Sequence, residues 1–231
     1  NCSSFETLTI GSGLKEIPAS YFANMTSLKT VNLSEGLEKI GDYAFSGCTY
    51  LETINVPDSV TFVGIEILKN TAWFNYRGKG LIVLDGWAYG YKGSDDNVTI
   101  TFDETVKNVA DEAFKNRSNI VVFEVDADNP YLLSENGVLF TKDKTELIAA
   151  IANNIGSEYV IPDTVEIIHS DAFYNRNSLW KITIPASVKS IGTDAFYLSS
   201  SRSVYITDLE AWCKIDFANA SANPLSAYYS Y

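Results

Sequence analysis

Apolar and polar positions repeat along this chain at an interval of 23 residues. Residues 28–48, LKTVNLSEGLEKIGDYAFSGC, return in closely similar form at residues 179–199 as LWKITIPASVKSIGTDAFYLS. The same interval separates the phenylalanines of neighbouring units, Phe22 from Phe45 and Phe173 from Phe196. An interval in the twenties is the length of one coil of a leucine-rich-repeat solenoid, which holds a short strand, a return segment and a turn.

Each unit opens with two apolar residues separated by one polar residue. This alternation predicts a strand that points its apolar side chains inward and the residues between them outward. Pro or Gly soon follows in several units and ends the strand, and a second apolar pair comes next. The inward pairs are Leu8/Ile10, Val31/Leu33, Ile54/Val56, Ile100/Phe102, Tyr159/Ile161 and Ile182/Ile184.

The residue pattern repeated around each phenylalanine predicts a short helical turn that closes the coil. Asp42, Asp111, Ser170 and Thr193 precede these turns, where an N-cap oxygen would accept from free backbone N–H groups. One unit cannot bury its apolar face alone, so stacked units should share a continuous core. The pattern therefore predicts an α/β repeat solenoid, a right-handed leucine-rich-repeat coil with a strand ladder and short helical turns.

Two segments break the repeat and predict β-hairpin insertions. The first, at about residues 70–97, has Asp85-Gly86 as a tight turn between two β-rich arms. The second, at about 129–158, should turn at residues 142–144. We expect the solenoid to span residues 1–206, and 207–231 to be a divergent terminal repeat or the start of a cap. The first residues resemble the end of an earlier unit, so we expect a fragment of a longer protein.

These units resemble a known family. The segments VPDSVTFVG, IPDTVEIIHSDAFYNRNSL and IPASVKSIGTDAFY are similar to BspA-like, or Treponema-type, leucine-rich repeats, and both irregular segments resemble segments inside such proteins. The chain departs from the pattern where Ile67-Leu68 replaces the Ala-Phe pair and where Arg117 and Arg176 replace the usual Cys. The resemblance implies an extracellular or cell-surface bacterial protein that adheres to host matrix proteins or to neighbouring cells.

Composition narrows the classes of partner. A net charge of -12 argues against nucleic acid and against anionic lipid, which both need clustered Lys and Arg. No apolar run reaches 18 residues, so we expect no membrane insertion of this segment. Cys2, Cys48 and Cys213 lack the number and spacing of a disulfide framework or a zinc site, and their redox state is left open.

The sequence offers little catalytic chemistry. His169 is the only histidine, and its neighbours Ser170 and Asp171 adjoin it in sequence rather than converging in space as a triad would. Asp126, Asp128 and Asn129 have the D-x-D-N spacing of a calcium loop but lack its Gly and distal Glu. A hydrolase built on two of the 29 acidic residues stays formally possible. We predict no enzyme activity, no cofactor and no metal.

Two surfaces compete as the binding site. One is the outward side of the strands, where Thr and Asn either contact a ligand or are present only because they suit strands. The other is the aromatic first hairpin, whose rings either stack on sugars or pack onto the solenoid. The strand-face candidates are Thr30, Asn32, Thr53, Asn55, Thr99, Thr101, Lys181 and Thr183, beside Thr7 and Thr9; the aromatic candidates are Trp73, Trp87, Tyr89 and Tyr91.

The expected function is therefore recognition without catalysis. We predict a secreted or surface module that binds host or neighbouring-cell surface or matrix proteins through the solenoid. The alternative is a carbohydrate-binding module of a glycan-utilisation protein that uses the aromatic hairpin, with glycans as the partner.

Overall fold

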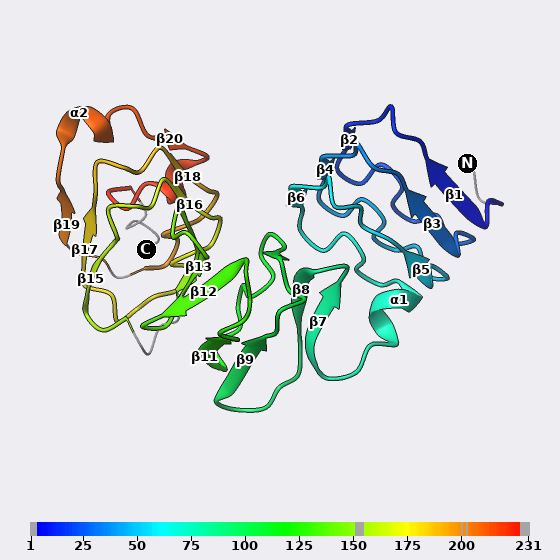
Figure 1. Ribbon diagram of the computed structural model, residues 1–231, viewed down its shortest axis with the longest axis horizontal. Helices are drawn as coiled ribbons and strands as arrows, with labels where there is room; N and C mark the ends of the chain where they lie inside the picture. The colour runs from blue at the N-terminus through cyan, green and yellow to red at the C-terminus, as the bar shows by residue number, and fades with distance from the viewer. Residues whose placement is uncertain (1–3, 151–154, 200, 202, 227–231) are drawn as a thin grey trace. The chain divides into compact units, whose positions relative to one another are not determined.

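The computed structural model describes residues 4–150, 155–199, 201 and 203–226. The chain forms two compact units, Asn1–Gly93 with Asn108–Ala113, and Ser94–Lys107 with Phe114–Tyr231. Both consist mainly of short strands joined by turns (Figure 1). The helices of the described residues are the four-residue α1 (Ala72–Asn75) and α2 (Leu209–Trp212) and the 3₁₀ turn η1 (Ala220–Ala222). None of these is long and apolar enough to cross a membrane.

Coils in the first unit stack through two parallel ladders. Leu8, Val31 and Ile54 lie side by side in the first ladder, and Ile17 and Ile40 pair in the second. The 23-residue interval thus places equivalent residues of successive coils in register. The first ladder contains β1 (Thr7–Ile10), β3 (Thr30–Leu33) and β5 (Thr53–Ile54), and the second contains β2 (Glu16–Ile17), β4 (Lys39–Ile40) and β6 (Phe62–Val63).

The second unit repeats this scheme with more strands. Two of its ladders are purely parallel: one pairs β9 with β11, and the other pairs β17 with β15 and with β19. Its third ladder has six strands in the order β12-β13-β14-β16-β18-β20. The strands are β9 (Val98–Phe102), β11 (Ile120–Val125), β12 (Leu132–Glu135), β13 (Val138–Thr141), β14 (Glu146–Ala150), β15 (Glu158–Val160), β16 (Ile167–Ile168), β17 (Lys181–Ile184), β18 (Ser190–Ile191), β19 (Ser203–Ile206) and β20 (Asp216–Phe217). Since β20 pairs with β18, the segment after residue 206 contributes a further strand to this ladder.

The predicted helical turns around the phenylalanines are wrong. The backbone there forms turns whose N–H groups donate to the next coil, as Phe22 N does to Ala44 O at 2.9 Å and Phe45 N to Ile67 O at 3.0 Å. The predicted N-cap Asp42 also bonds across coils, accepting from Ile65 N at 3.0 Å. The turns thus form a third ladder, and a β-solenoid replaces the expected α/β class.

Left-handed backbone conformations explain why these turns do not continue as helices. A positive φ recurs two residues before and two residues after the phenylalanine position of each coil. Such residues interrupt a right-handed helix and turn alternate amides toward the neighbouring coil. The residues before it are Ser20, Tyr43, Glu66, Glu112, Asp171 and Asp194, and those after it are Asn24, Gly47, Asn70, Asn116, Asn175 and Leu198.

The two irregular segments form antiparallel strand pairs that are built into the ladders. β7 (Gly80–Leu84) pairs with β8 (Trp87–Lys92) around Asp85 and Gly86, which both have a positive φ. β8 also pairs in parallel with β10 (Asn108–Val109), and β14 pairs in parallel with β16. One arm of each pair therefore takes the place of a coil strand, so these segments are not insertions beside the solenoid.

The core lies between the ladders and is continuous within each unit. Phe22 stacks on Phe45 with ring centroids 5.5 Å apart, and Phe173 stacks on Phe196 at 5.0 Å. Phe45, Phe173 and Phe196 have no exposed surface. Burying a side chain of this size contributes about 1.5–3 kcal/mol, so the repeated aliphatic and aromatic positions drive the stacking of coils.

A close approach between coils explains a recurring glycine. A Cβ on Gly41 would lie 2.7 Å from Ala19 N of the preceding coil, and a Cβ on Gly64 would lie 2.7 Å from Asp42 N. A Cβ on Gly192 would likewise clash with Ser170 N of the preceding coil. Ala110 and His169 occupy this position in the two coils that stack on a hairpin arm, β8 or β14.

Candidate ligand-binding surfaces

The outer face of β1, β3 and β5 carries rows of small polar side chains. Thr30 lies between Thr7 and Thr53 in register, and Asn32 lies beside Thr9. Thr9, Asn32 and Thr53 are exposed and Thr30 is partly exposed. The structure therefore brings most of the predicted Thr/Asn residues of the first unit onto one face, which we call the Thr/Asn face.

Asn55 differs from its neighbours because its amide is already used. Its Oδ1 accepts from Leu33 N at 2.9 Å and its Nδ2 donates to Leu33 O at 2.8 Å. β5 ends at Ile54, so the Asn55 side chain replaces the next backbone pair of the ladder. The Asn55 amide therefore has a structural role, and its contact with a ligand stays a prediction.

Ion pairs join neighbouring coils beside both ladders of the first unit, next to the Thr/Asn face and next to β2 and β4. Lys29 Nζ lies 2.8 Å from Glu6 Oε1, and Lys15 Nζ lies 2.6 Å from Glu38 Oε1, in both cases between residues 23 apart. The hydrogen bond and charge of Glu6 raise the pKa of Lys29. These pairs are exposed, so each contributes little to stability, but their spacing favours the correct register of coils.

The remaining strand-face candidates lie in the second unit. Thr99 and Thr101 are exposed on β9 and lie in register with Val122 and Glu124 of β11. Lys181 and Thr183 are partly exposed on β17. The predicted strand-face residues are thus divided between the two units.

Apolar residues that the sequence analysis did not select accompany Lys181 and Thr183. Val160, Thr183 and Tyr205 form one row across β15, β17 and β19, and Val160 and Tyr205 are exposed. Trp180, just before β17, is also exposed. Strand alternation predicts the outward direction of Tyr205 in VYI, but the exposure of Trp180 beside the buried Leu179 has no comparable sequence signal. We call this surface, with Glu158, the aromatic strand face.

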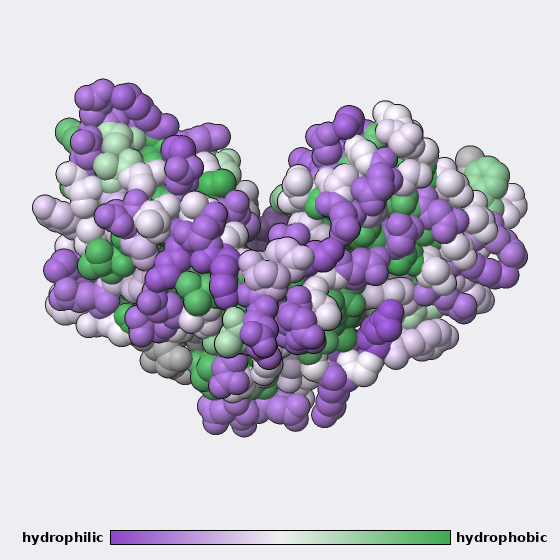
Figure 2. Space-filling model, in the orientation of Figure 1, coloured by the Kyte–Doolittle hydropathy of each residue, from purple (hydrophilic) through white to green (hydrophobic). Residues whose placement is uncertain are grey.

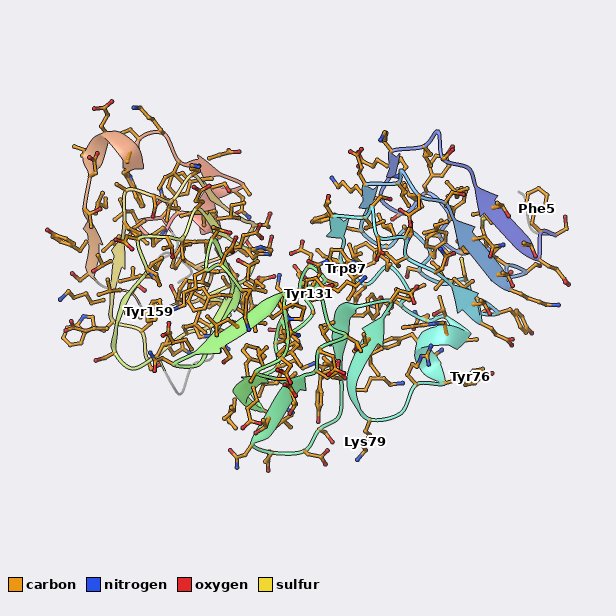
Figure 3. All side chains as sticks on the ribbon, in the orientation of Figure 1. Phe5, Tyr76, Lys79, Trp87, Tyr131 and Tyr159 are labelled. Atoms are coloured by element: carbon orange, nitrogen blue, oxygen red, sulfur yellow. The ribbon has the colours of Figure 1, made fainter. Side chains whose placement is uncertain are left out.

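The aromatic hairpin is buried instead of exposed. Trp73, Trp87, Tyr89 and Tyr91 are all less than a tenth exposed, and Trp87 lies among the strands in Figure 3. Tyr89 Oη accepts from Leu68 N at 2.7 Å, and burial raises the pKa of the Tyr89 hydroxyl. Trp73 lies in α1 and the other three rings lie in β8, and all four are packed against their surroundings, so the predicted platform for sugars at these four residues is wrong.

Candidates for catalysis or metal binding have structural partners. His169 Nε2 lies 2.7 Å from Glu146 Oε2, and this hydrogen bond lowers the pKa of the Glu146 carboxyl. Asn129 is buried; its Oδ1 accepts from Tyr131 N and Leu132 N, and its Nδ2 donates to Asp103 O and Val106 O. Asn129 is thus unsuited to bind calcium. Within the described residues, no three His, Cys, Asp or Glu side chains gather to hold a metal.

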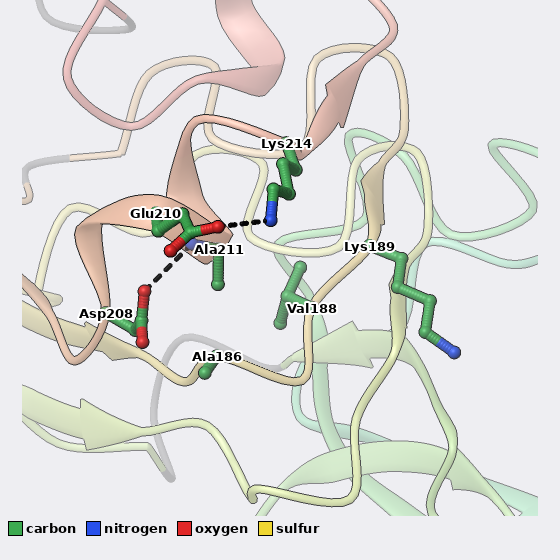
Figure 4. A pocket seen from close by; sticks show the side chains of 7 residues that line it. All are labelled: Ala186, Val188, Lys189, Asp208, Glu210, Ala211 and Lys214. Atoms are coloured by element: carbon green, nitrogen blue, oxygen red, sulfur yellow. Dashed lines mark hydrogen bonds and ion pairs between the residues drawn. The ribbon is translucent and has the colours of Figure 1, made fainter.

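A hollow of about 300 Å³ lies near the C-terminal ends of β17 and β19 (Figure 4). Its charged groups already have partners: Lys214 Nζ lies 2.7 Å from Glu210 Oε1, and Asp208 Oδ1 accepts from Ala211 N. The hollow therefore offers fewer free hydrogen-bonding groups to a ligand than the strand faces do.

Polar residues dominate the surface visible in Figure 2, with small apolar patches between them.

Comparison with known proteins agrees with this fold. The family model of the BspA type leucine-rich repeat region matches residues 1–75 and 151–222 in six copies. Comparison with curated proteins finds no significant match.

The solved structures that are similar to the chain share little sequence with it. The chain is similar to the pneumococcal vaccine antigen PcpA, with 21% identity, 87% of this chain and 50% of that chain covered, and a TM-score of 0.43. It is also similar to a leucine-rich cell surface protein of Faecalibacterium prausnitzii, with 20% identity, 94% and 65% covered, and a TM-score of 0.45. The chain spans between half and about two thirds of these proteins. Because the family model covers more than half of its residues, the chain belongs to the BspA-type leucine-rich-repeat family.

Proposed function

We propose that this chain is a non-catalytic binding module that recognises protein ligands through the outer sides of its strand ladders. The observation that supports the proposal is the Thr/Asn face. Its rows of exposed hydroxyl and amide groups stand on strands whose opposite side chains form the buried core. We further propose that the module acts outside the cell or at its surface, on host or neighbouring-cell surface or matrix proteins.

Rigidity makes such a face suitable for binding. The rows stand on strands joined to one another by the parallel β1-β3-β5 ladder, so little backbone entropy remains to be lost when a ligand binds. Thr and Asn offer donors and acceptors without a large desolvation cost, and repeat proteins use extended surfaces of this kind for protein ligands. The family supports the same location and role.

The test uses immobilised fibronectin, laminin and collagen as probes. The double variant Asn32→Arg, Thr53→Arg places two large charges on the Thr/Asn face. Its matched control, Thr26→Arg with Thr49→Arg, adds the same charge at exposed turn positions. We expect saturable binding to at least one probe that the face variant weakens at least tenfold and the control leaves unchanged. Equal loss in both variants, or no binding to any probe by the parent chain, would contradict the proposal.

A further inference from the structure

The aromatic strand face has a different chemistry from the Thr/Asn face. Trp180 is 59% exposed, Tyr205 is 60% exposed and Val160 is 67% exposed. Single exposed apolar side chains are common on protein surfaces, but several that gather on and beside neighbouring strands commonly mark a binding site. In the equivalent rows of the first unit the same positions carry Lys29, Thr9 and Asn55, so the repeat itself does not require the apolar residues.

Polar groups separate the apolar residues of this face. Thr183 lies between Val160 and Tyr205, and the ion pair of Lys181 with Glu158, at 2.9 Å, lies in the next outward row. Strand spacing and rise place the backbones of Trp180 and Tyr205 roughly 11 Å apart. Among the described residues, the face therefore alternates rings with hydrogen-bonding groups, and the charges of Lys181 and Glu158 balance each other within an acidic chain.

This alternation fits a sugar chain better than a protein. A protein hot spot is a contiguous apolar centre from which water is excluded, and charged residues are depleted there. Covering the Lys181–Glu158 pair with apolar protein surface would cost desolvation energy without returning hydrogen bonds. A sugar ring instead presents an apolar C–H side for an aromatic ring and hydroxyl groups around its rim. Those hydroxyls can donate to the Glu158 carboxylate and accept from the Lys181 ammonium group.

We propose that the aromatic strand face binds an uncharged oligosaccharide, with sugar rings stacked on Trp180 and Tyr205. Lys181, Glu158 and Thr183 supply hydrogen bonds between the two rings. The chain contains four Trp residues, and this site uses the exposed one. The proposal does not depend on the protein-binding function, which uses the Thr/Asn face.

Trp180 provides a built-in reporter for the test. The other tryptophans, Trp73, Trp87 and Trp212, are buried, so quenching by acrylamide reports mainly on Trp180. The probes are the hexasaccharides of cellulose, xylan, β-mannan and chitin, titrated into the whole chain. We expect at least one of them to shift the Trp emission and to protect it from acrylamide in a saturable manner.

Three variants locate the site. Tyr205→Ala keeps the reporter and should weaken binding about tenfold, as expected for loss of one stacking ring. Trp180→Ala should abolish the heat of binding in calorimetry. Tyr50→Ala removes an exposed ring from a turn of the first unit and should change nothing. Because all three side chains are exposed, the melting temperatures should stay close to that of the parent chain.

The proposal fails under any of three results. No hexasaccharide protects Trp180 at millimolar concentration, or binding survives Trp180→Ala, or Tyr50→Ala weakens binding as much as Tyr205→Ala. A matrix protein that protects Trp180 from acrylamide while the sugars do not would also overturn it, and would identify the face as a protein-docking surface.

Discussion

Replacing Gly64 with alanine tests how closely the coils stack. Gly64 does not have a positive φ, so alanine is compatible with its backbone conformation. Its new Cβ, however, would lie 2.7 Å from Asp42 N and 2.9 Å from Gly41 C, whereas ordinary contacts begin at 3.4 Å. The nearest atom is Asp42 Oδ1 of a side chain, but the other two are backbone atoms of the preceding coil, which a side-chain rotation cannot move away.

The structure allows the cost of this change to be worked out. Reaching 3.4 Å from 2.7 Å requires a shift of about 0.7 Å, which would stretch the hydrogen bonds from Gly64 N to Ile40 O (2.9 Å) and from Ile65 N to Asp42 Oδ1 (3.0 Å) beyond normal length. Two weakened bonds cost about 1–3 kcal/mol, and overpacking costs a further ~1–3 kcal/mol. We expect a loss of roughly 3 kcal/mol, which lowers the melting temperature by about 6–12 °C in a chain of this size.

Gly11→Ala is the matched control. A Cβ on Gly11 meets no atom within 4 Å, and Gly11 also lacks a positive φ. Its alanine variant should be as stable as the parent or gain about 0.4–1 kcal/mol through a less flexible unfolded chain. The assay is thermal and urea unfolding of both variants by circular dichroism. If Gly64→Ala had the same melting temperature as Gly11→Ala, the contact between coils would not explain the glycine, and the reasoning would be refuted.

Three further predictions concern the core, the turns and the hairpin. Phe45→Ala should cost about 3–5 kcal/mol, because it removes a buried ring stacked on Phe22; an unchanged urea midpoint would contradict this. Leu198→Asn should stabilise the chain by about 1 kcal/mol, because Leu198 has a φ of 55° where four other coils have Asn; a lower melting temperature would show that the leucine contacts outweigh the strain. Since the hydrogen bond from His169 lowers the pKa of Glu146, this carboxylate stabilises the folded chain above its unfolded pKa and loses that effect as pH falls through the folded pKa. Glu146→Gln should therefore be less stable than the parent at neutral pH and equal to it in strong acid, and a pH-independent difference in urea midpoints would contradict this.

Much of the fold follows from periodicity, and the errors have a common cause. The inward pairs and the 23-residue register could be predicted because burial of apolar residues is repeated at each coil. The helical turns could not, because a short polar residue before a turn favours an N-cap and a bond to the next coil equally well, as Asp42 shows. Local sequence does not reveal which partner a backbone amide will find when another coil lies beside it.

Burial explains the errors in the candidate sites. Trp73, Trp87, Tyr89 and Tyr91 look like a binding platform in sequence, but the hairpin supplies part of the solenoid core. Trp180 lies one residue after a buried leucine, where a strict alternation is not yet established, so its exposure depends on how the chain enters β17. Large aromatic side chains carry no sequence mark that separates packing from binding.

The recurring glycine has an explanation in coil packing that periodicity alone does not provide. Gly41, Gly64 and Gly192 each face the backbone of a regular preceding coil, where no Cβ fits. Ala110 and His169 occupy the same position, but the strands before them belong to the hairpin arms β8 and β14. A hairpin arm runs on as a strand instead of turning beneath this position, so a side chain is tolerated. Ala218 also occupies this position, above the regular strand β18, so a missing glycine does not by itself indicate a hairpin. His169 lies at the junction with β14, where it bonds Glu146 of the arm itself.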